Sequence, residues 1–341
     1  MIVTVRMRIK NPARRKTNPD TSKRSTKMKK HCFGIDIGGT FIKGAIIDNS
    51  GNVVVKDKIP TECKNGSSRV VENIKTLCER LLATANMKKA DITAIGMGVP
   101  GMIDGDAGVV ITSENLGFKN FDIARKTEEI MGLPVKISND ANVAALGEMK
   151  FGYGGTYRSI ILLTLGTGVG GGIIIDGKIV EGNKGAGAEL GHSVIEIGGE
   201  PCSCGRRGCL EAYASATAII RDTKRAMQAH PDSKLWQIGS LDAVNGKTAF
   251  DFSDTDAYAK EVVESYVKHL ACGIVNLANI FRPDAIILGG GVCAQGDSLI
   301  NPLKEILDKE IYGGSLGPKV KLLVAKLGND AGCLGAAALV I

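Results

Sequence analysis

The sequence lacks any long apolar run. Its 341 residues contain no stretch near the roughly 20 apolar residues that a membrane-spanning helix needs. The N-terminus is also too basic and polar to form the apolar core of a signal peptide. These two absences predict a cytoplasmic protein with no membrane partner.

A disulfide framework is missing as well. The cysteine count of nine is odd, and three of the cysteines are crowded into Cys202, Cys204 and Cys209. The other six are isolated in the sequence: Cys32, Cys63, Cys78, Cys272, Cys293 and Cys333. This pattern indicates reduced thiols and a metal site rather than paired cysteines.

Negative charge is almost absent from the first 30 residues. They hold eleven Lys or Arg against the single acid Asp20, whereas the other 311 residues carry 32 basic and 35 acidic side chains. The net charge of +7 therefore belongs to this arm and not to the rest of the chain. A basic arm is able to bind nucleic acid or a membrane surface. We expect instead a disordered extension, or an upstream start with Met28 as the natural initiator.

The remaining composition is typical of a globular α/β protein with two domains, because apolar residues make up 44% of the chain and glycine is abundant. Strand-like and helix-like periods alternate through both halves, which predicts parallel strands linked by helices. Among these segments we expect a helix over 68–85, turns over 100–108, and one continuous helix over 210–229.

An internal repeat is the strongest sign of domain organisation. A glycine turn joins the apolar runs Phe33–Ile37 and Phe41–Ile47, which predicts a β-hairpin. A shift of 128 positions lays Ile160–Asp176 over this hairpin, with Asp36 on Thr164, Gly38 on Gly166, Gly44 on Gly172 and Asp48 on Asp176. The repeat occurs twice and opens an α/β segment each time, so it predicts duplicated domains rather than a solenoid. Chance similarity of two glycine-rich hairpins is the alternative.

Two such hairpins, facing each other, can present backbone N–H groups to a polyphosphate from both sides. Glycine allows close approach of the main chain, and Thr40 and Thr167 can add hydroxyl donors. Neither turn is a Walker loop or a Gly-x-Gly-x-x-Gly dinucleotide motif, because each runs into a strand. Taken singly, each reads equally well as an ordinary tight turn.

Asp140 is the candidate general base. Phosphoryl transfer to an alcohol needs a group that accepts the hydroxyl proton. Asn139 and Asp140 follow a predicted strand at 135–138 and precede a predicted helix, and open α/β sheets bind ligands at the carboxyl ends of strands. The alternative is that Asp140 only caps that helix.

A closed zinc site is predicted around the cysteine cluster. Cys202, Cys204 and Cys209, with His192 ten residues before the first cysteine, fit four tetrahedral ligands. Four protein ligands leave no open position, so the metal is structural and not the catalytic electrophile. It is expected to fix the loop that carries Glu189 and Glu211 and to affect the phosphate hairpins less. Reduced thiols in a loop are the alternative.

The segments Asp36-Ile-Gly-Gly-Thr40 and Leu165-Gly-Thr-Gly-Val-Gly-Gly-Gly172 resemble the phosphate loops of the actin, hexokinase and Hsp70 superfamily. Within it, residues 31–341 resemble the ROK family of bacterial sugar kinases and repressors, including its signature Gly-His-x₉-Cys-x-Cys-Gly-x-x-Gly-Cys-x-Glu that ends at Glu211. The resemblance implies an α/β, two-domain actin-like ATPase (ribonuclease H-like) fold with duplicated βββαβα units. It implies a smaller lobe of 31–138 plus 329–341 and a larger lobe of 139–328 with a zinc loop at 192–209.

The resemblance also implies ATP-dependent phosphorylation of a hexose with Mg²⁺ and a structural Zn²⁺, and a homodimer or homotetramer. Asp36 is expected to hold Mg²⁺ through water. The implied nucleotide contacts are Asp36, Gly38, Gly39, Thr40, Lys43, Gly166, Thr167, Gly168, Gly289, Gly290 and Gly291. The implied sugar contacts are Gly101, Asn139, Asp140, Glu189, His192 and Glu211. We expect Glu189 and Glu211 to be buried, although a lone Glu is usually a solvated surface residue.

Glucose is the preferred substrate because Asn115–Phe118 and the overall pattern look most like ROK glucokinases. Kinases for mannose, fructose, allose, N-acetylglucosamine and N-acetylmannosamine share these motifs. A ROK-type sugar-responsive repressor is the rival from another class. Such repressors carry a helix-turn-helix domain, which 30 basic residues without amphipathic helices are too few to form. Intact Asp36 and Asp140 also favour an enzyme, so no nucleic-acid partner is expected.

Overall fold

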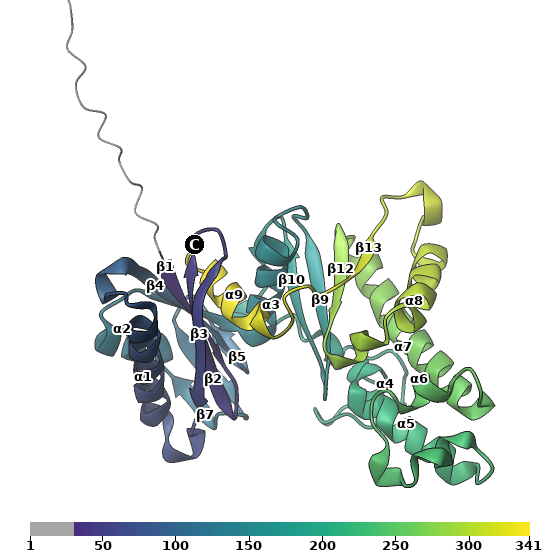
Figure 1. Cartoon of the computed structure of the whole chain (residues 1–341). Helices are drawn as coiled ribbons and strands as arrows, with labels where there is room; N and C mark the ends of the chain where they lie inside the picture. The colour runs from purple at the N-terminus through teal and green to yellow at the C-terminus, as the bar shows by residue number, and fades with distance from the viewer. Residues whose placement is uncertain (1–30) are drawn as a thin grey trace, which may run out of the picture.

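The computed structural model describes residues 31–341, so the basic arm and Met28 lie outside the described residues. Figure 1 shows two α/β halves side by side, each built on a five-stranded sheet, with α3 (Asp140–Gly147) and α9 (Ala331–Ala338) between them. No helix in the described range is both long and apolar enough to cross a membrane.

The first sheet has the strand order β3-β2-β1-β4-β8. Its strands are β1 (His31–Ile37), β2 (Phe41–Asp48), β3 (Val53–Pro60), β4 (Ile92–Val99) and β8 (Val135–Asn139). The first three pair in antiparallel fashion, and β1, β4 and β8 run parallel. A β-hairpin therefore opens the sheet, and its parallel part follows.

The second sheet repeats this topology in the order β11-β10-β9-β12-β13. Its strands are β9 (Ile160–Leu165), β10 (Val169–Ile175), β11 (Lys178–Ile179), β12 (Ala285–Gly289) and β13 (Lys321–Val324). Again the first three pair in antiparallel fashion, and β9, β12 and β13 are parallel. The duplication predicted from the sequence is confirmed.

Each half has its own hydrophobic core. In the first, α1 (Ser67–Ala85) packs on β2 and β3, and its Leu77 lies against the backbone of Gly44. In the second, α7 (Ala257–Phe281) buries Leu270 in one cluster with strand residues of β9 and β12. Helices α5 (Ala216–Ala229), α6 (Thr248–Phe252) and α8 (Asp297–Glu310) pack against α7.

The expected turns at 100–108 are wrong in part. Strand β5 (Met102–Asp104) pairs with β6 (Val109–Ser113), which pairs with β7 (Phe118–Phe121), and together they form a small third sheet beside α2 (Ile123–Met131). These strands are too short to show a clear period, yet each one buries an apolar side chain in the first core.

The expected continuous helix over 210–229 is also wrong. The structure divides it into α4 (Glu211–Ala214) and α5, because Ser215 is extended at φ −82° and ψ 164°. The Ser215 hydroxyl accepts a hydrogen bond from the backbone N–H of Ala218 and so caps α5. Serine favours this position because its side chain satisfies a free donor of the first helical turn.

Backbone contacts join the two halves through α3 and α9. Helix α9 packs on β1 and β4, and α3 packs on α9 and on β10 of the second sheet. A Cβ atom at Gly96 would overlap the carbonyl group of Ala336, and one at Gly335 would overlap that of Val143. Glycine is required at both positions because no side chain fits at this separation.

Candidate active site

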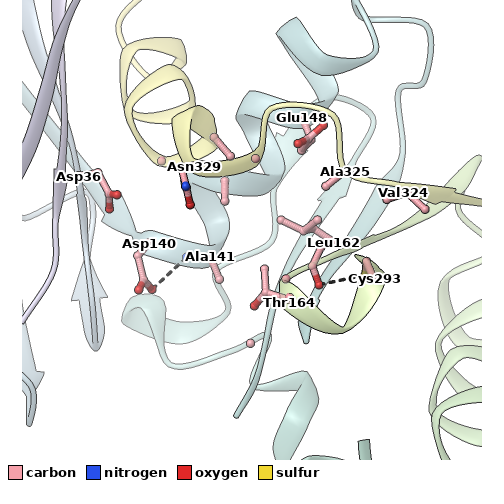
Figure 2. Close-up of a pocket in the computed structure, with 18 of the residues that line it drawn as sticks. Asp36, Asp140, Ala141, Glu148, Leu162, Thr164, Cys293, Val324, Ala325 and Asn329 are labelled. Carbon is pink, nitrogen blue, oxygen red and sulfur yellow. Dashed lines mark hydrogen bonds between the residues drawn. The ribbon is translucent and has the colours of Figure 1, made fainter. Parts of the chain in front are cut away.

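A cavity of about 600 Å³ lies between the two halves, and both of them line it. Asp36 comes from the end of β1, Asp140 from the start of α3, and Thr164 from β9. Gly289–Gly291 follow β12, and Asn329 precedes α9. Figure 2 shows Asp36 and Asp140 near one another, with Thr164 and Leu162 across the cavity. Asp36 and Thr164 occupy equivalent positions in the repeat, so the cavity lies between the duplicated units.

Asp36 and Lys43 are two charged residues that the first half contributes to the lining of the larger cavity. They face each other across the β1–β2 pair, and Lys43 Nζ lies 3.2 Å from Asp36 Oδ2. The Asp36 side chain is 19% exposed and that of Lys43 45%, so water screens the ion pair and Lys43 can turn toward another anion. A Cβ atom at Gly332 would lie 2.6 Å from Asp36 Cγ, so the start of α9 packs directly on this carboxylate.

A backbone hydrogen bond closes each of the two hairpin turns. Gly38 donates its N–H to the carbonyl of Phe41, and Gly166 donates its N–H to that of Gly168. Six turn residues were predicted to contact the nucleotide, but none of them is among the described residues that line either cavity: Gly38, Gly39, Thr40, Gly166, Thr167 and Gly168. The adjoining strand residues Lys43 and Gly170 line the larger cavity instead.

Gly289, Gly290 and Gly291 line the larger cavity, as part of the wall from the second half. Gly290 has φ 93°, and a side chain there would overlap the backbone of Leu165 at the end of β9. Only glycine fits this combination of backbone conformation and contact. The glycine run therefore brings bare main chain to the cavity at the carboxyl end of β12.

Asp140 stands at the first position of α3, while Asn139 caps the helix. Asn139 Oδ1 accepts hydrogen bonds from the N–H groups of Ala141 at 2.8 Å and of Asn142 at 3.3 Å. Asp140 Oδ1 also accepts from Ala141, at 2.9 Å. Because Asn139 is the cap, a capping function alone does not account for a carboxylate at position 140.

Burial raises the pKa of Asp140 above its usual value, and the nearby negative charges of Asp36 and Glu189 raise it further. The hydrogen bond from the Ala141 N–H opposes these effects because it favours the ionised form. A raised pKa makes the carboxylate a stronger proton acceptor at pH values where it is ionised.

A second cavity of about 250 Å³ adjoins the first. Gly101, Asn115, Asn139 and Glu189 contribute to its lining, and the Asn139 amide donates a hydrogen bond to the Gly101 carbonyl at 3.0 Å. Three residues line both cavities: Asp140, Ala141 and Gly170. Asp140 is therefore accessible to a ligand in either cavity.

The two carboxylates predicted to be buried differ from that expectation. Glu189 is exposed where it lines the smaller cavity, and it directly precedes a single helical turn, Leu190–His192. Glu211 is half-buried, and it is not among the described residues that line either cavity. Its Oε2 atom accepts a hydrogen bond from the N–H of Val169 at 3.1 Å. Glu211 thus contacts the β9–β10 hairpin, which the sequence predicted to be less affected by the metal loop.

His192, Cys202, Cys204 and Cys209 converge on one point. Their ligand atoms all lie within 4.8 Å of one another. His192 Nδ1 is 3.5 Å from Cys202 Sγ, and Cys204 Sγ is 3.8 Å from Cys209 Sγ. Tetrahedral ligands at ordinary Zn–N and Zn–S bond lengths lie roughly 3.5 to 3.8 Å apart. The donor set and these two distances fit Zn²⁺.

Short backbone contacts position the four ligands. Val194 bridges to Cys209, and a turn closed by the Gly205 N–H and the Cys202 carbonyl brings Cys202 and Cys204 together. The backbone N–H of Arg206 lowers the pKa of the Cys204 thiol, whereas burial raises that of Cys209 to about 12. Metal binding at this site would therefore release a proton from Cys209.

Sequence reasoning missed several residues of the larger cavity. Thr164 could have been found, because it overlays Asp36 in the repeat. Glu148 and Asn329 belong to no motif. The carboxylate of Glu148 is fully buried and accepts the N–H groups of Lys326 and Leu327, so it holds the chain between β13 and α9 against the cavity.

Comparisons with known proteins agree with the fold and the motifs. The profile of the ROK family matches residues 32–341. A glucokinase from Halalkalibacterium halodurans is 40% identical over 310 residues, which cover 89% of this chain and 92% of that protein. The xylose repressor of Bacillus subtilis is 30% identical over 312 residues, which cover 91% of this chain and 77% of the repressor.

Among solved structures, a ROK family glucokinase from Streptomyces griseus in complex with glucose and AMPPNP has a TM-score of 0.73 and 33% identity to this chain. The likeness covers 91% of this chain and 98% of that one. The predicted actin-like fold is confirmed. With the family profile matching nearly the whole described range, the chain belongs to the ROK family.

Proposed function

We propose that the protein transfers the γ-phosphoryl group of ATP to the 6-hydroxyl of a hexose, and that the hexose is glucose. One observation carries the proposal: Asp140 lines both cavities, so a hydroxyl in the smaller one and a phosphoryl group in the larger one meet at the same carboxylate. The similarity to proteins named as glucokinases supports the choice of reaction and sugar.

Asp140 would accept the proton of the attacking hydroxyl as general base. Its position and its raised pKa, caused first by burial, suit that task. Lys43 would bind the negatively charged phosphates, and the backbone around Gly289–Gly291 would contact the rest of the nucleotide. Mg²⁺, when bound with ATP, neutralises charge on the phosphates. Asp36 is the carboxylate of the larger cavity that would hold this ion.

The smaller cavity would take the hexose. Its amide and carboxylate groups at Asn139 and Glu189 can pair with ring hydroxyls, and a sugar without such a hydroxyl would leave them unpaired. His192 and Glu211 would complete the sugar contacts only after movement toward this cavity. Such movement fits a site that closes around its ligand and excludes water.

Zn²⁺ would hold the loop 192–209, with His192, Cys202, Cys204 and Cys209 as ligands. The interatomic distances that match a tetrahedral site support this proposal. The lobes would be 31–138 plus 329–341 and 139–328, a division that the packing of α9 on β1 and β4 supports. A homodimer or homotetramer and a cytoplasmic location stay predictions.

A sugar-responsive repressor is the second candidate, because a xylose repressor is 30% identical to this chain. The glucokinase from Halalkalibacterium halodurans is more similar, at 40%, which favours the kinase. Among kinases, those for mannose, fructose, allose, N-acetylglucosamine and N-acetylmannosamine remain alternatives to glucokinase.

The purified protein should form ADP from Mg·ATP only when a hexose is present. A coupled ADP assay against these six sugars is expected to give the highest kcat/KM for glucose, because the chain is 40% identical to a glucokinase. The Asp140→Asn protein, prepared in the same way, reports any contaminating kinase. A second sugar with a higher kcat/KM would overturn the choice of glucose, and no ADP with any of them would contradict a kinase for these sugars.

Replacing Asp140 with Asn should lower kcat by at least ~10²-fold, the usual scale of a lost general base. Glucose affinity, measured by calorimetry, should stay within a few fold because Asn keeps the size of the side chain. Asp232→Asn, at an exposed position away from both cavities, is the matched control and should behave as wild type. An Asp140→Asn enzyme with more than about a tenth of wild-type turnover would mean that another group is the base.

Protein prepared without chelators should contain about one equivalent of zinc. Cys204→Ser should lose the metal and raise the KM for glucose by roughly tenfold or more, because the metal fixes the loop that bears the sugar-binding side chains. Cys272→Ser, in α7, is the control and should keep both properties. Less than about half an equivalent of zinc in the wild-type protein would exclude a structural metal, and an unchanged glucose KM in Cys204→Ser would separate the metal from the sugar site.

A further inference from the structure

The carboxylate of Glu211 contacts two segments at once. Its Oε2 atom accepts a hydrogen bond from the N–H of Val169 at 3.1 Å, and its Oε1 atom accepts one from the Ser203 hydroxyl at 2.9 Å. Val169 directly follows the turn of the β9–β10 hairpin, and Ser203 lies between the first two cysteines of the cluster. The side chain therefore connects the hairpin to the cysteine loop.

The contact with the hairpin is close. A Cβ atom at Gly168 would overlap the Glu211 carboxylate, so the carboxylate packs directly on the turn. The turn is held elsewhere through its carbonyl groups, because the N–H of Ala216 donates to Gly166 at 2.8 Å and the Thr217 hydroxyl donates to Thr167 at 2.8 Å. Glu211 adds the contact to an N–H group at the far end of the turn.

We infer that Glu211 is a positioning residue for the β9–β10 hairpin in the protein without bound sugar, and that Ser203 holds it in that position. The cysteine loop then sets the affinity for nucleotide as well as the shape of the sugar site. Backbone N–H groups bind phosphates well only when the turn is already ordered. The inference rests on the proposed kinase function and on the nucleotide contacts that the resemblance to the ROK family implies for Gly166, Thr167 and Gly168.

Three variants separate this arrangement from a general loss of structure. Ser203→Ala removes one hydrogen bond from an exposed side chain. Glu211→Ala removes this bond, the bond from Val169, and a contact of 3.6 Å between Cys202 Sγ and Glu211 Oε1. Glu211→Gln keeps an oxygen that can accept from Val169 and an amide group that can face the Ser203 oxygen. Ser240→Ala is the matched control, since Ser240 is exposed and makes no side-chain capping bond.

Two measurements apply to every variant that retains its wild-type metal content. Hydrogen exchange of peptides covering residues 165–171, in the ligand-free protein, reports the order of the hairpin. Calorimetry with Mg·AMPPNP gives the nucleotide Kd. We expect Ser203→Ala to weaken nucleotide binding by about three- to tenfold and Glu211→Ala by about tenfold or more, both with faster exchange. Glu211→Gln should stay within about threefold of wild type in both measurements.

Wild-type exchange and nucleotide affinity in both Ser203→Ala and Glu211→Ala would overturn the inference. The inference would also be overturned if Glu211→Gln weakened nucleotide binding as much as Glu211→Ala while Ser203→Ala had no effect. The charge of Glu211, and not its hydrogen bonds, would then determine nucleotide affinity. If Glu211→Ala loses its metal, Ser203→Ala and Glu211→Gln decide. A wild-type protein that binds no nucleotide would contradict the proposed function, and the exchange of 165–171 would still test the connection itself.

Discussion

Backbone contact between α3 and α9 is the constraint on which the rest of the structure depends. Both helices lie between the two sheets, and glycines at 96 and 335 bring α9 so near to β4 and α3 that no side chain could intervene. Asp140 is the first residue of α3, and the start of α9 packs on Asp36. The same packing that joins the halves therefore brings these two carboxylates to one cavity.

A polar site in this position follows from the duplication. In each copy, residues near the carboxyl ends of the parallel strands line the cavity between the halves, and the equivalent positions carry Asp36 in one copy and Thr164 in the other. Each copy also carries a segment that the other copy lacks. The first carries the small sheet β5–β7, whereas the second carries the cysteine loop and, through Glu211, a connection from that loop to its own hairpin.

The sequence predicted what local patterns determine. Glycine turns between apolar runs revealed both hairpins, and the spacing of the cysteines predicted a cluster that the structure brings together with His192. It could not predict features that depend on side-chain direction or on distant packing. Glu211 faces Val169 rather than the smaller cavity, and β5 is too short to show a period. Ser215 divides a helical pattern because its hydroxyl caps the next helix.

Asp140 lines both cavities, and we propose that the two halves joined by α3 and α9 close over a hexose in the smaller cavity and a nucleotide in the larger one. Small-angle X-ray scattering of the wild-type protein, with and without saturating glucose and Mg·AMPPNP, tests this directly. Closure predicts a smaller radius of gyration in the presence of the ligands, because water must be excluded from the γ-phosphate. An unchanged scattering profile under conditions where calorimetry shows both ligands bound would contradict the account.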